Sequence, residues 1–267
     1  MAYCLIALGS NLGDRAAQLR QAVAALASLP TIRLIAHSAW LETPPIGGPP
    51  GQGPFLNAAA LISTSLAPAA LMAELRRIEL ALGRARAERW AARSLDVDLL
   101  LYDDAIIQTT ELQIPHPRMA FRRFVLEPAA EIAAAMIHPE SGWTIGELLR
   151  HLNRGAELIA VAALEAGVAD QLVQQVASEL NLAIVTGEPS CGGQPGVARW
   201  TTEIANRAVR PKLLLAVDTS AGVDAHQLRR MLQLPLTGPI AWIEPPSANG
   251  VHEALAAVQS VWPPLAT

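Results

Sequence analysis

The chain has 267 residues, of which 51% are hydrophobic and 16% are charged, and its formal net charge is −4. This composition excludes an intrinsically disordered chain, and the length allows one large domain or two modest ones. Because no net positive charge is available to drive counterion release, the sequence also argues against nucleic acid as a partner.

The sequence predicts a cytoplasmic protein without a membrane partner. Its alanine-rich stretches are interrupted by arginine, glutamate or proline before they reach the length of a membrane span. The first residues lack the basic start of a signal peptide. Only two cysteines are present, so neither a disulfide framework nor a structural zinc site is expected.

The first hundred residues alternate between strand and helix patterns. Strands are predicted at Tyr3–Leu8, Ile32–Leu41, Phe55–Thr64 and Asp96–Tyr102, and helices from Asp14 to about Leu29 and over Pro68–Leu82. The order βαββαβ indicates a ferredoxin-like α+β fold, with an antiparallel sheet and helices on one face. The region Ile114–Arg150 is expected to add a loop and two short helical segments.

A segment rich in proline and glycine, from Thr43 to Pro54, separates the second and third predicted strands. It cannot form a helix or a central strand. The segment is either a flexible linker or an ordered lid that wraps a ligand. Its position between two strands of one compact unit favours the lid.

The character of the sequence changes near Arg154, where we place a domain boundary between residues 1–154 and 155–267. Alanine-rich helical segments alternate there with short apolar strands, which is typical of a smaller α/β domain with a parallel sheet. The predicted helices are Asp170–Leu180, Ala198–Arg207, Asp224–Leu232 and His252–Val261. The predicted strands are Leu182–Val185, Leu213–Val217 and Ile240–Ile243.

Two aspartates at the start of the fourth strand are the clearest candidates for chemistry. Asp96 and Asp98 are two residues apart, so their side chains share one face of the strand. Two like charges so close favour a cation between them, and Mg²⁺ with phosphate oxygens as its other ligands fits that demand. The alternative is that the aspartates are solvated or pair with Arg93. Arginines that could grip phosphate oxygens in pairs stand just upstream, at Arg84, Arg86, Arg89 and Arg93.

Residues 3–152 contain a series of motifs in a fixed order. They are Leu8–Gly13, Glu42–Gly47, Phe55–Ala58, Glu79–Arg84, Arg89–Leu100, Pro115–Pro117 and Arg122–Pro128. Together they resemble the 6-hydroxymethyl-7,8-dihydropterin pyrophosphokinase family of folate biosynthesis. The resemblance implies an ATP-dependent diphosphotransferase that transfers pyrophosphate from ATP to the hydroxymethyl group of the dihydropterin and releases AMP.

The same resemblance implies a role for each matching residue. Asp96 and Asp98 would hold two Mg²⁺ ions, and Arg84 and Arg93 would join them in catalysis. Pterin-binding roles fall on Thr43, Ile46, Phe55, Asn57 and Phe124, which supply two rings and an amide for a flat heteroaromatic. Nucleotide-binding roles fall on Glu79, Arg84, Trp90, Arg93, His116 and Arg122.

Residues 155–267 give less information about function. They contain no G-x-x-x-x-G-K-[ST] loop, and the segment Gly187–Gly193 lacks the lysine of a phosphate-binding loop. Their alternation of predicted helices and strands resembles a degenerate nucleotide-kinase fold. We favour an interaction module through which the chain forms a homo-oligomer. One alternative is a bifunctional enzyme with a second nucleotide- or folate-related activity in this half. Another is a non-catalytic regulator that binds pterin or nucleotide.

Overall fold

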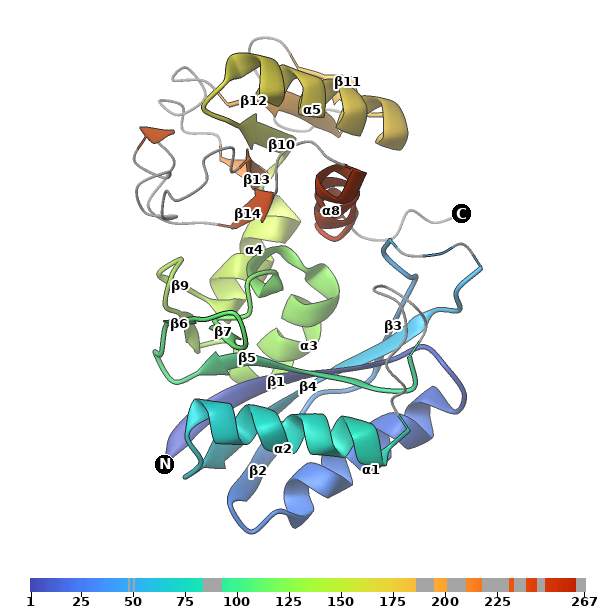
Figure 1. Cartoon of the computed structure of the whole chain (residues 1–267), viewed down its shortest axis with the longest axis vertical. Coiled ribbons are helices and arrows are strands. Elements are labelled where there is room, and N and C mark those ends of the chain that lie inside the picture. Colours follow the sequence, from blue (N-terminus) through green and yellow to red (C-terminus); the bar gives the residue numbers. More distant parts are fainter. Residues whose placement is uncertain are drawn as a thin grey trace. The chain divides into compact units, whose positions relative to one another are not determined.

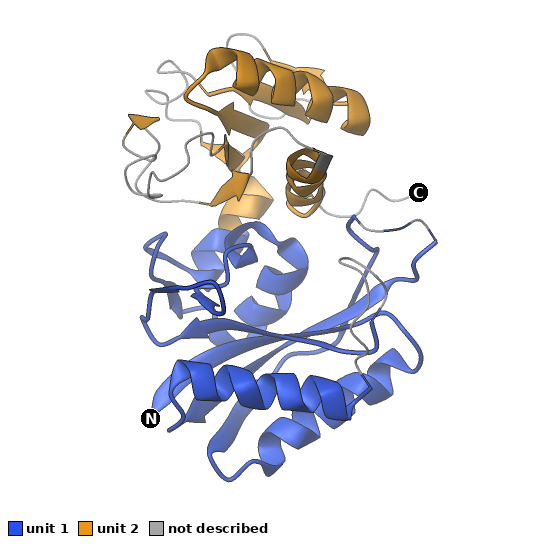
Figure 2. Cartoon of the chain, viewed as in Figure 1, with its two compact units in different colours: residues 1–149, 264–267 blue, residues 150–263 orange. Residues whose placement is uncertain are grey.

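The computed structural model describes residues 1–47, 49, 51–83, 93–185, 195–200, 210–217, 231–232, 239–243 and 248–262. The chain divides into two compact units, Met1–Leu149 and Arg150–Pro263 (Figure 2). Among the described residues, no helix is both long enough and apolar enough to cross a membrane.

An antiparallel sheet forms the centre of the first unit. Its strands are β1 (Ala2–Ser10), β2 (Ile32–His37), β3 (Leu41–Thr43), β4 (Phe55–Thr64) and β5 (Asp96–Tyr102). They are ordered β2-β4-β1-β5, and β3 also pairs with β4. Every pairing is antiparallel, and β5 lies at one edge of the sheet.

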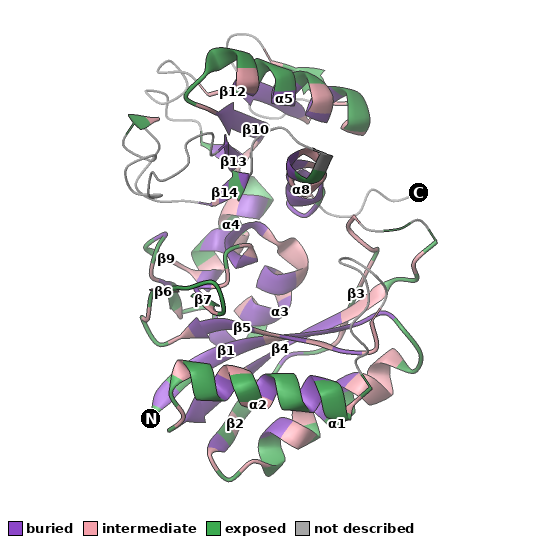
Figure 3. Ribbon diagram, in the orientation of Figure 1, coloured by how far each residue is buried: buried purple, intermediate pink, exposed green. Residues whose placement is uncertain are grey.

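Helices α1 (Arg15–Ser28) and α2 (Pro68–Ala81) lie on the same face of this sheet (Figure 1). The Asp14 side chain caps α1 by accepting a hydrogen bond of 2.9 Å from the N–H of Ala17. Buried residues line the strands and the inner faces of both helices, whose outer faces are exposed (Figure 3). The shared core includes Ile6, Leu8, Leu19, Leu26, Ile62, Leu71 and Leu75.

The opposite face of the sheet carries α3 (Arg123–Ala133), which follows the short 3-10 helix η1 (Met119–Phe121) and contacts β1 and β4 (Figure 1). Helix α4 (Ile145–Arg154) comes later in the chain. Two small hairpins complete this region. They are β6 (Ile107–Gln108) with β7 (Gln113–Ile114), and β8 (Ile137–His138) with β9 (Trp143–Thr144).

The second unit contains a parallel sheet in the order β11-β12-β10-β13-β14. Its strands are β10 (Ala156–Ala162), β11 (Ala183–Ile184), β12 (Gly196–Arg199), β13 (Pro211–Val217) and β14 (Ile240–Ile243). Every residue of β13 is buried, as expected for a central parallel strand. Helices α5 (Ala166–Leu180) and α8 (Ala248–Gln259) contact one another.

The structure corrects several predicted elements. The strand predicted over Ile32–Leu41 is interrupted, because residues 38–40 separate β2 from β3. The helix predicted over Ala198–Arg207 is wrong at its start, since Ala198 lies in β12 between two paired strands. Pairing and burial there override the helix propensity of alanine. Strand β10 was missed for the same reason, because it contains three alanines. The segment Gly187–Gly193 lies outside the described residues.

Candidate active site

A pocket lies on the face of the first unit's sheet that α1 and α2 leave uncovered. Its walls come from β1, β4 and β5, from the segment that follows β3, and from the start of α3. Many of the residues singled out in the sequence meet there. The lining includes Thr43, Ile46, Phe55, Asn57, Arg93, Asp96, Asp98, Arg122 and Phe124.

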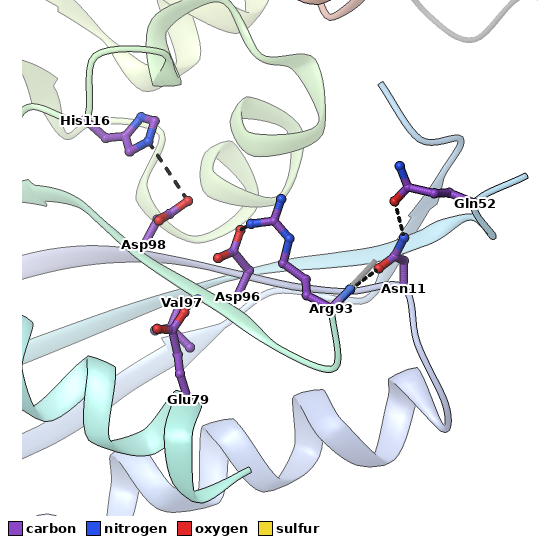
Figure 4. A network of polar contacts seen from close by, with 8 residues as sticks. All are labelled: Asn11, Gln52, Glu79, Arg93, Asp96, Val97, Asp98 and His116. Carbon is purple, nitrogen blue, oxygen red and sulfur yellow. Dashed lines mark hydrogen bonds and ion pairs between the residues drawn. The ribbon is translucent and has the colours of Figure 1, made fainter. Parts of the chain in front are cut away.

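The alternation of β5 turns both aspartates toward this pocket. Val97 is buried in the core beside α2, whereas Asp96 and Asp98 point to the opposite face (Figure 4). The register places Asp96 opposite Gly9 of β1. A Cβ atom at Gly9 would stand in van der Waals contact with Asn57 Oδ1, at 3.4 Å, so Gly9 places the Asn57 amide beside the aspartate strand.

The two carboxylates have different neighbours. Asp96 Oδ2 accepts a hydrogen bond of 2.8 Å from Arg93 Nη1, so the pairing that we held open as an alternative is present at this residue. Asp98 Oδ2 lies 4.0 Å from His116 Nε2, which is too long for a hydrogen bond. Neither carboxylate is fully buried, because 23% of the Asp96 side chain and 36% of the Asp98 side chain are exposed. Both therefore remain accessible from the pocket.

Burial sets the ionisation of two groups beside the aspartates. Burial, followed by the charges of Arg122 and Arg118, lowers the pKa of His116 to about 3. The imidazole is therefore neutral near pH 7, and its contact with Asp98 is not an ion pair. Burial also lowers the pKa of Arg122 to about 10, with a smaller effect of Arg118 in the same direction. Arg122 thus keeps its positive charge at neutral pH.

Aromatic and amide groups form another part of the pocket. Phe55 begins β4 and Phe124 lies in the first turn of α3, and the Arg122 guanidinium stands 5.5 Å from the centre of the Phe124 ring. The Asn57 amide nitrogen donates a hydrogen bond of 2.9 Å to Thr43 Oγ1, which fixes the orientation of the amide. Two rings and an oriented amide suit a flat heteroaromatic ligand with polar edges.

Asn11 is a residue that the sequence analysis left without a role. Its side chain accepts a hydrogen bond of 2.8 Å from the Arg93 N–H and donates one of 3.1 Å to Gln52 Oε1 (Figure 4). Its own N–H donates to the Arg93 carbonyl at 3.2 Å. Asn11 therefore joins the backbone before β5 to the proline- and glycine-rich segment. The motif Leu8–Gly13 signalled a tight turn, but not these long-range partners.

The described part of the proline- and glycine-rich segment is tied to the rest of the first unit. Arg15 Nη1 donates a hydrogen bond of 2.8 Å to the Pro54 carbonyl, and Arg15 also forms an ion pair of 2.8 Å with Glu42. Within the same segment, Thr43, Ile46 and Gln52 line the pocket. These contacts favour the interpretation of the segment as an ordered lid and not as a flexible linker.

Comparison with known proteins places the chain in a family. The sequence model described as 7,8-dihydro-6-hydroxymethylpterin-pyrophosphokinase (HPPK) matches residues 5–134. The 2-amino-4-hydroxy-6-hydroxymethyldihydropteridine pyrophosphokinase of Methylorubrum extorquens is 44% identical over 153 residues, which cover 57% of this chain and 95% of the relative. The chain belongs to the HPPK family. The Haemophilus influenzae enzyme of the same description is 43% identical over 141 residues, covering 53% of this chain and 88% of that relative.

Among solved structures, Plasmodium falciparum HPPK-DHPS with pteroate aligns to this HPPK family member with a TM-score of 0.46. The two sequences are 12% identical in that alignment, which covers 90% of this chain and 70% of the other.

Not every residue implied by the HPPK resemblance lies in the pocket. Arg84 and Trp90 are outside the described residues. His116 is not part of the pocket wall, although it approaches Asp98. Glu79 is also outside the pocket lining, because the residue is only 6% exposed and lies on the helix-covered face of β5, where its Oε1 accepts the Val97 N–H (Figure 4). The nucleotide-binding role of Glu79 stays a prediction.

The donor set matches the requirements of magnesium in a substrate complex. Within the described ranges, no group of three or more histidine, cysteine, aspartate or glutamate side chains is placed to hold a metal ion. Mg²⁺ usually binds through one or two carboxylates and takes its remaining ligands from water and substrate phosphates. The accessible pair Asp96 and Asp98 fits that pattern, and the neighbouring arginines fit the phosphates.

Proposed function

We propose that the first unit transfers pyrophosphate from ATP to the hydroxymethyl group of 6-hydroxymethyl-7,8-dihydropterin, giving AMP and the pterin diphosphate in folate biosynthesis. Membership of the HPPK family supports this activity. One structural observation assigns the activity to the pocket. The carboxylate pair and the aromatic and amide groups line one and the same pocket, so a phosphate chain and a flat ring can meet there.

The pterin would occupy the part of the pocket between Phe55 and Phe124. Both rings supply flat apolar surface, and the Asn57 amide offers hydrogen bonds to the polar edge of the substrate. The bond from Asn57 to Thr43 leaves the amide oxygen and one N–H for the ligand. We assign Thr43 and Ile46 to the pterin side as parts of the lid wall.

The triphosphate would lie beside Arg93 and Arg122. The positive charges of these two guanidinium groups in the pocket wall can stabilise the negative charge that develops during phosphoryl transfer. The family resemblance adds Arg84 and Trp90 to this side. His116 would act as a neutral hydrogen-bond donor to the nucleotide, because the Arg118 N–H occupies its Nδ1 at 3.1 Å and leaves the proton on Nε2.

Asp96 and Asp98 would hold two magnesium ions together with oxygens of the triphosphate. Bound magnesium supplies charge neutralisation at the phosphate oxygens. The chain's own contribution is orientation, since β5 fixes the spacing of the carboxylates and Asn11 fixes the backbone of Arg93. Catalysis of this kind depends on positioning and electrostatics more than on covalent chemistry.

We further propose that the first unit is ferredoxin-like and that the functional domain ends near Arg154. The strand order β2-β4-β1-β5, with α1 and α2 on one face, supports the fold. Helix α4 ends at Arg154, so this boundary keeps the helix intact. The remaining residues, 155–267, would form an interaction module that the chemistry does not need. In support, the described residues that line the pocket end at Val125.

The product of ATP turnover tests the proposed function. Incubation with ATP, Mg²⁺ and 6-hydroxymethyl-7,8-dihydropterin should release AMP in amounts equal to the pterin diphosphate formed. Release of ADP, or no turnover by folded protein, would reject the assignment. If the chain is a non-catalytic regulator, folded protein should show no turnover, so the same assay separates that alternative from the enzyme.

A further inference from the structure

Glu79 is a buried carboxylate beneath the proposed metal site. It lies near the C-terminal end of α2, and its side chain is part of the interior between that helix and β5. Its Oε1 accepts a hydrogen bond of 2.7 Å from the N–H of Val97. Val97 stands between Asp96 and Asp98, so Glu79 contacts the backbone at the centre of the carboxylate pair (Figure 4).

The position of β5 explains why this N–H needs a partner. Within the described part of the chain, β5 is an edge strand that pairs with β1 alone, with Val97 opposite Leu8. In an antiparallel pair, successive residues turn their N–H groups alternately toward the partner strand and away from it. The Val97 N–H is directed away from β1, and Glu79 satisfies it as a neighbouring strand would. The edge strand is thereby fixed between the two aspartates.

A carboxylate forms a stronger bond here than a neutral acceptor would, because a charged acceptor shortens and strengthens an N–H hydrogen bond. Burying a carboxylate also costs free energy unless the group is well satisfied. The bond is buried, so an N–H left without an acceptor at this point would also be costly. Such an arrangement at the one residue between two proposed metal ligands indicates a role in the geometry of the site.

We propose that Glu79 is a positioning residue that sets the spacing and orientation of Asp96 and Asp98 through the Val97 N–H. This inference rests on the proposed function, because it assumes that the two aspartates bind magnesium with the nucleotide. The role proposed here acts through the Val97 backbone and not through a bond from Glu79 to the metal. Its influence on metal binding is indirect, as with outer partners of metal ligands in other sites, whose loss commonly costs about 10- to 100-fold in affinity or activity.

The test compares three variants of the full chain. Glu79→Gln keeps an acceptor oxygen of the same reach, whereas Glu79→Met keeps the size and removes the acceptor. Glu74→Met is the matched control, because Glu74 lies on the same helix and pairs with Arg77 at the surface. Two readouts do not depend on turnover. They are amide hydrogen exchange of the peptide that contains Val97, and Mn²⁺ affinity in the presence of a non-hydrolysable ATP analogue.

Glu79→Met should accelerate exchange at Val97 and weaken Mn²⁺ binding by about 10-fold or more, with little change in pterin affinity. Glu79→Gln and Glu74→Met should stay within about threefold of the unaltered chain. The proposal is overturned if Mn²⁺ affinity is unchanged in folded Glu79→Met, or if Glu79→Gln loses as much as Glu79→Met. Should Glu79→Met fail to fold, Glu79→Asp, which shortens the side chain, carries the same prediction. Absence of AMP formation by the unaltered chain would reject the proposed function alone, since both readouts are independent of the reaction.

Discussion

Replacing Phe124 with alanine should weaken pterin binding far more than ATP binding. Phe124 lines the pocket in the first turn of α3. Removing one aromatic platform from a stacked heteroaromatic base costs about 1–3 kcal/mol. This range corresponds to a loss of about 5- to 150-fold in pterin affinity. The Arg122 guanidinium, 5.5 Å from the ring centre, would also lose a contact of about 0.5–1 kcal/mol. ATP affinity should therefore change by less than about fivefold.

Isothermal titration of each ligand separately, with a non-hydrolysable ATP analogue in place of ATP, measures both effects. Phe124→Tyr is the matched control, because it keeps the ring, and its pterin affinity should remain within about threefold of the unaltered chain. Equal losses for both ligands in Phe124→Ala would refute the reasoning. An equal loss in Phe124→Tyr and Phe124→Ala would also refute it, since stacking on the ring could then not be the cause.

The remaining predictions concern the domain boundary and the pH dependence of stability. A chain ending at Arg154 should fold and keep its AMP-forming activity, and a folded but inactive truncation would show that residues 155–267 contribute to the site. His138 is buried and its Nδ1 accepts the Ser141 N–H at 3.2 Å, and burial lowers its pKa to about 4. Above pH 6.5 this histidine is neutral in both states, whereas between pH 6.5 and 4 only the unfolded chain takes up the proton. The free energy of unfolding should therefore fall by up to about 3 kcal/mol across that window. In urea unfolding measured as a function of pH, His138→Asn should remove this part of the decline in the free energy of unfolding. The control His37→Asn, at an exposed position, should not remove it. An identical pH dependence for His138→Asn and the unaltered chain would contradict the assignment.

The first unit was predictable because its local signals agree with its packing. Asp14 is a helix cap in the sequence and in the structure, and the strand at Asp96–Tyr102 begins and ends as predicted. The second unit was harder, because its strands are short and rich in alanine. Ala198 shows the difficulty, since only the neighbouring strands of the sheet decide that it lies in a strand.

The candidate site was likewise predictable only in part. The spacing of Asp96 and Asp98 on a strand predicts a shared face, and both line the pocket. The contacts of Glu79 and Asn11 could not be predicted from spacing, because each reaches a backbone group far along the chain. Glu79 bonds to Val97 across 18 residues and Asn11 to Arg93 across 82. Such partners are set by tertiary structure, and a single sequence carries no periodic signal for them.

The most direct test of the account is the number of divalent cations that the site holds. Electron paramagnetic resonance of free Mn²⁺, in the presence of a non-hydrolysable ATP analogue and the pterin, counts the ions bound to each chain. Two ions per chain are expected, with at least one of them lost in Asp98→Ala, which should retain weak binding of the ATP analogue and show no turnover. An unchanged count and full activity in Asp98→Ala would contradict the claim that these carboxylates carry the reaction.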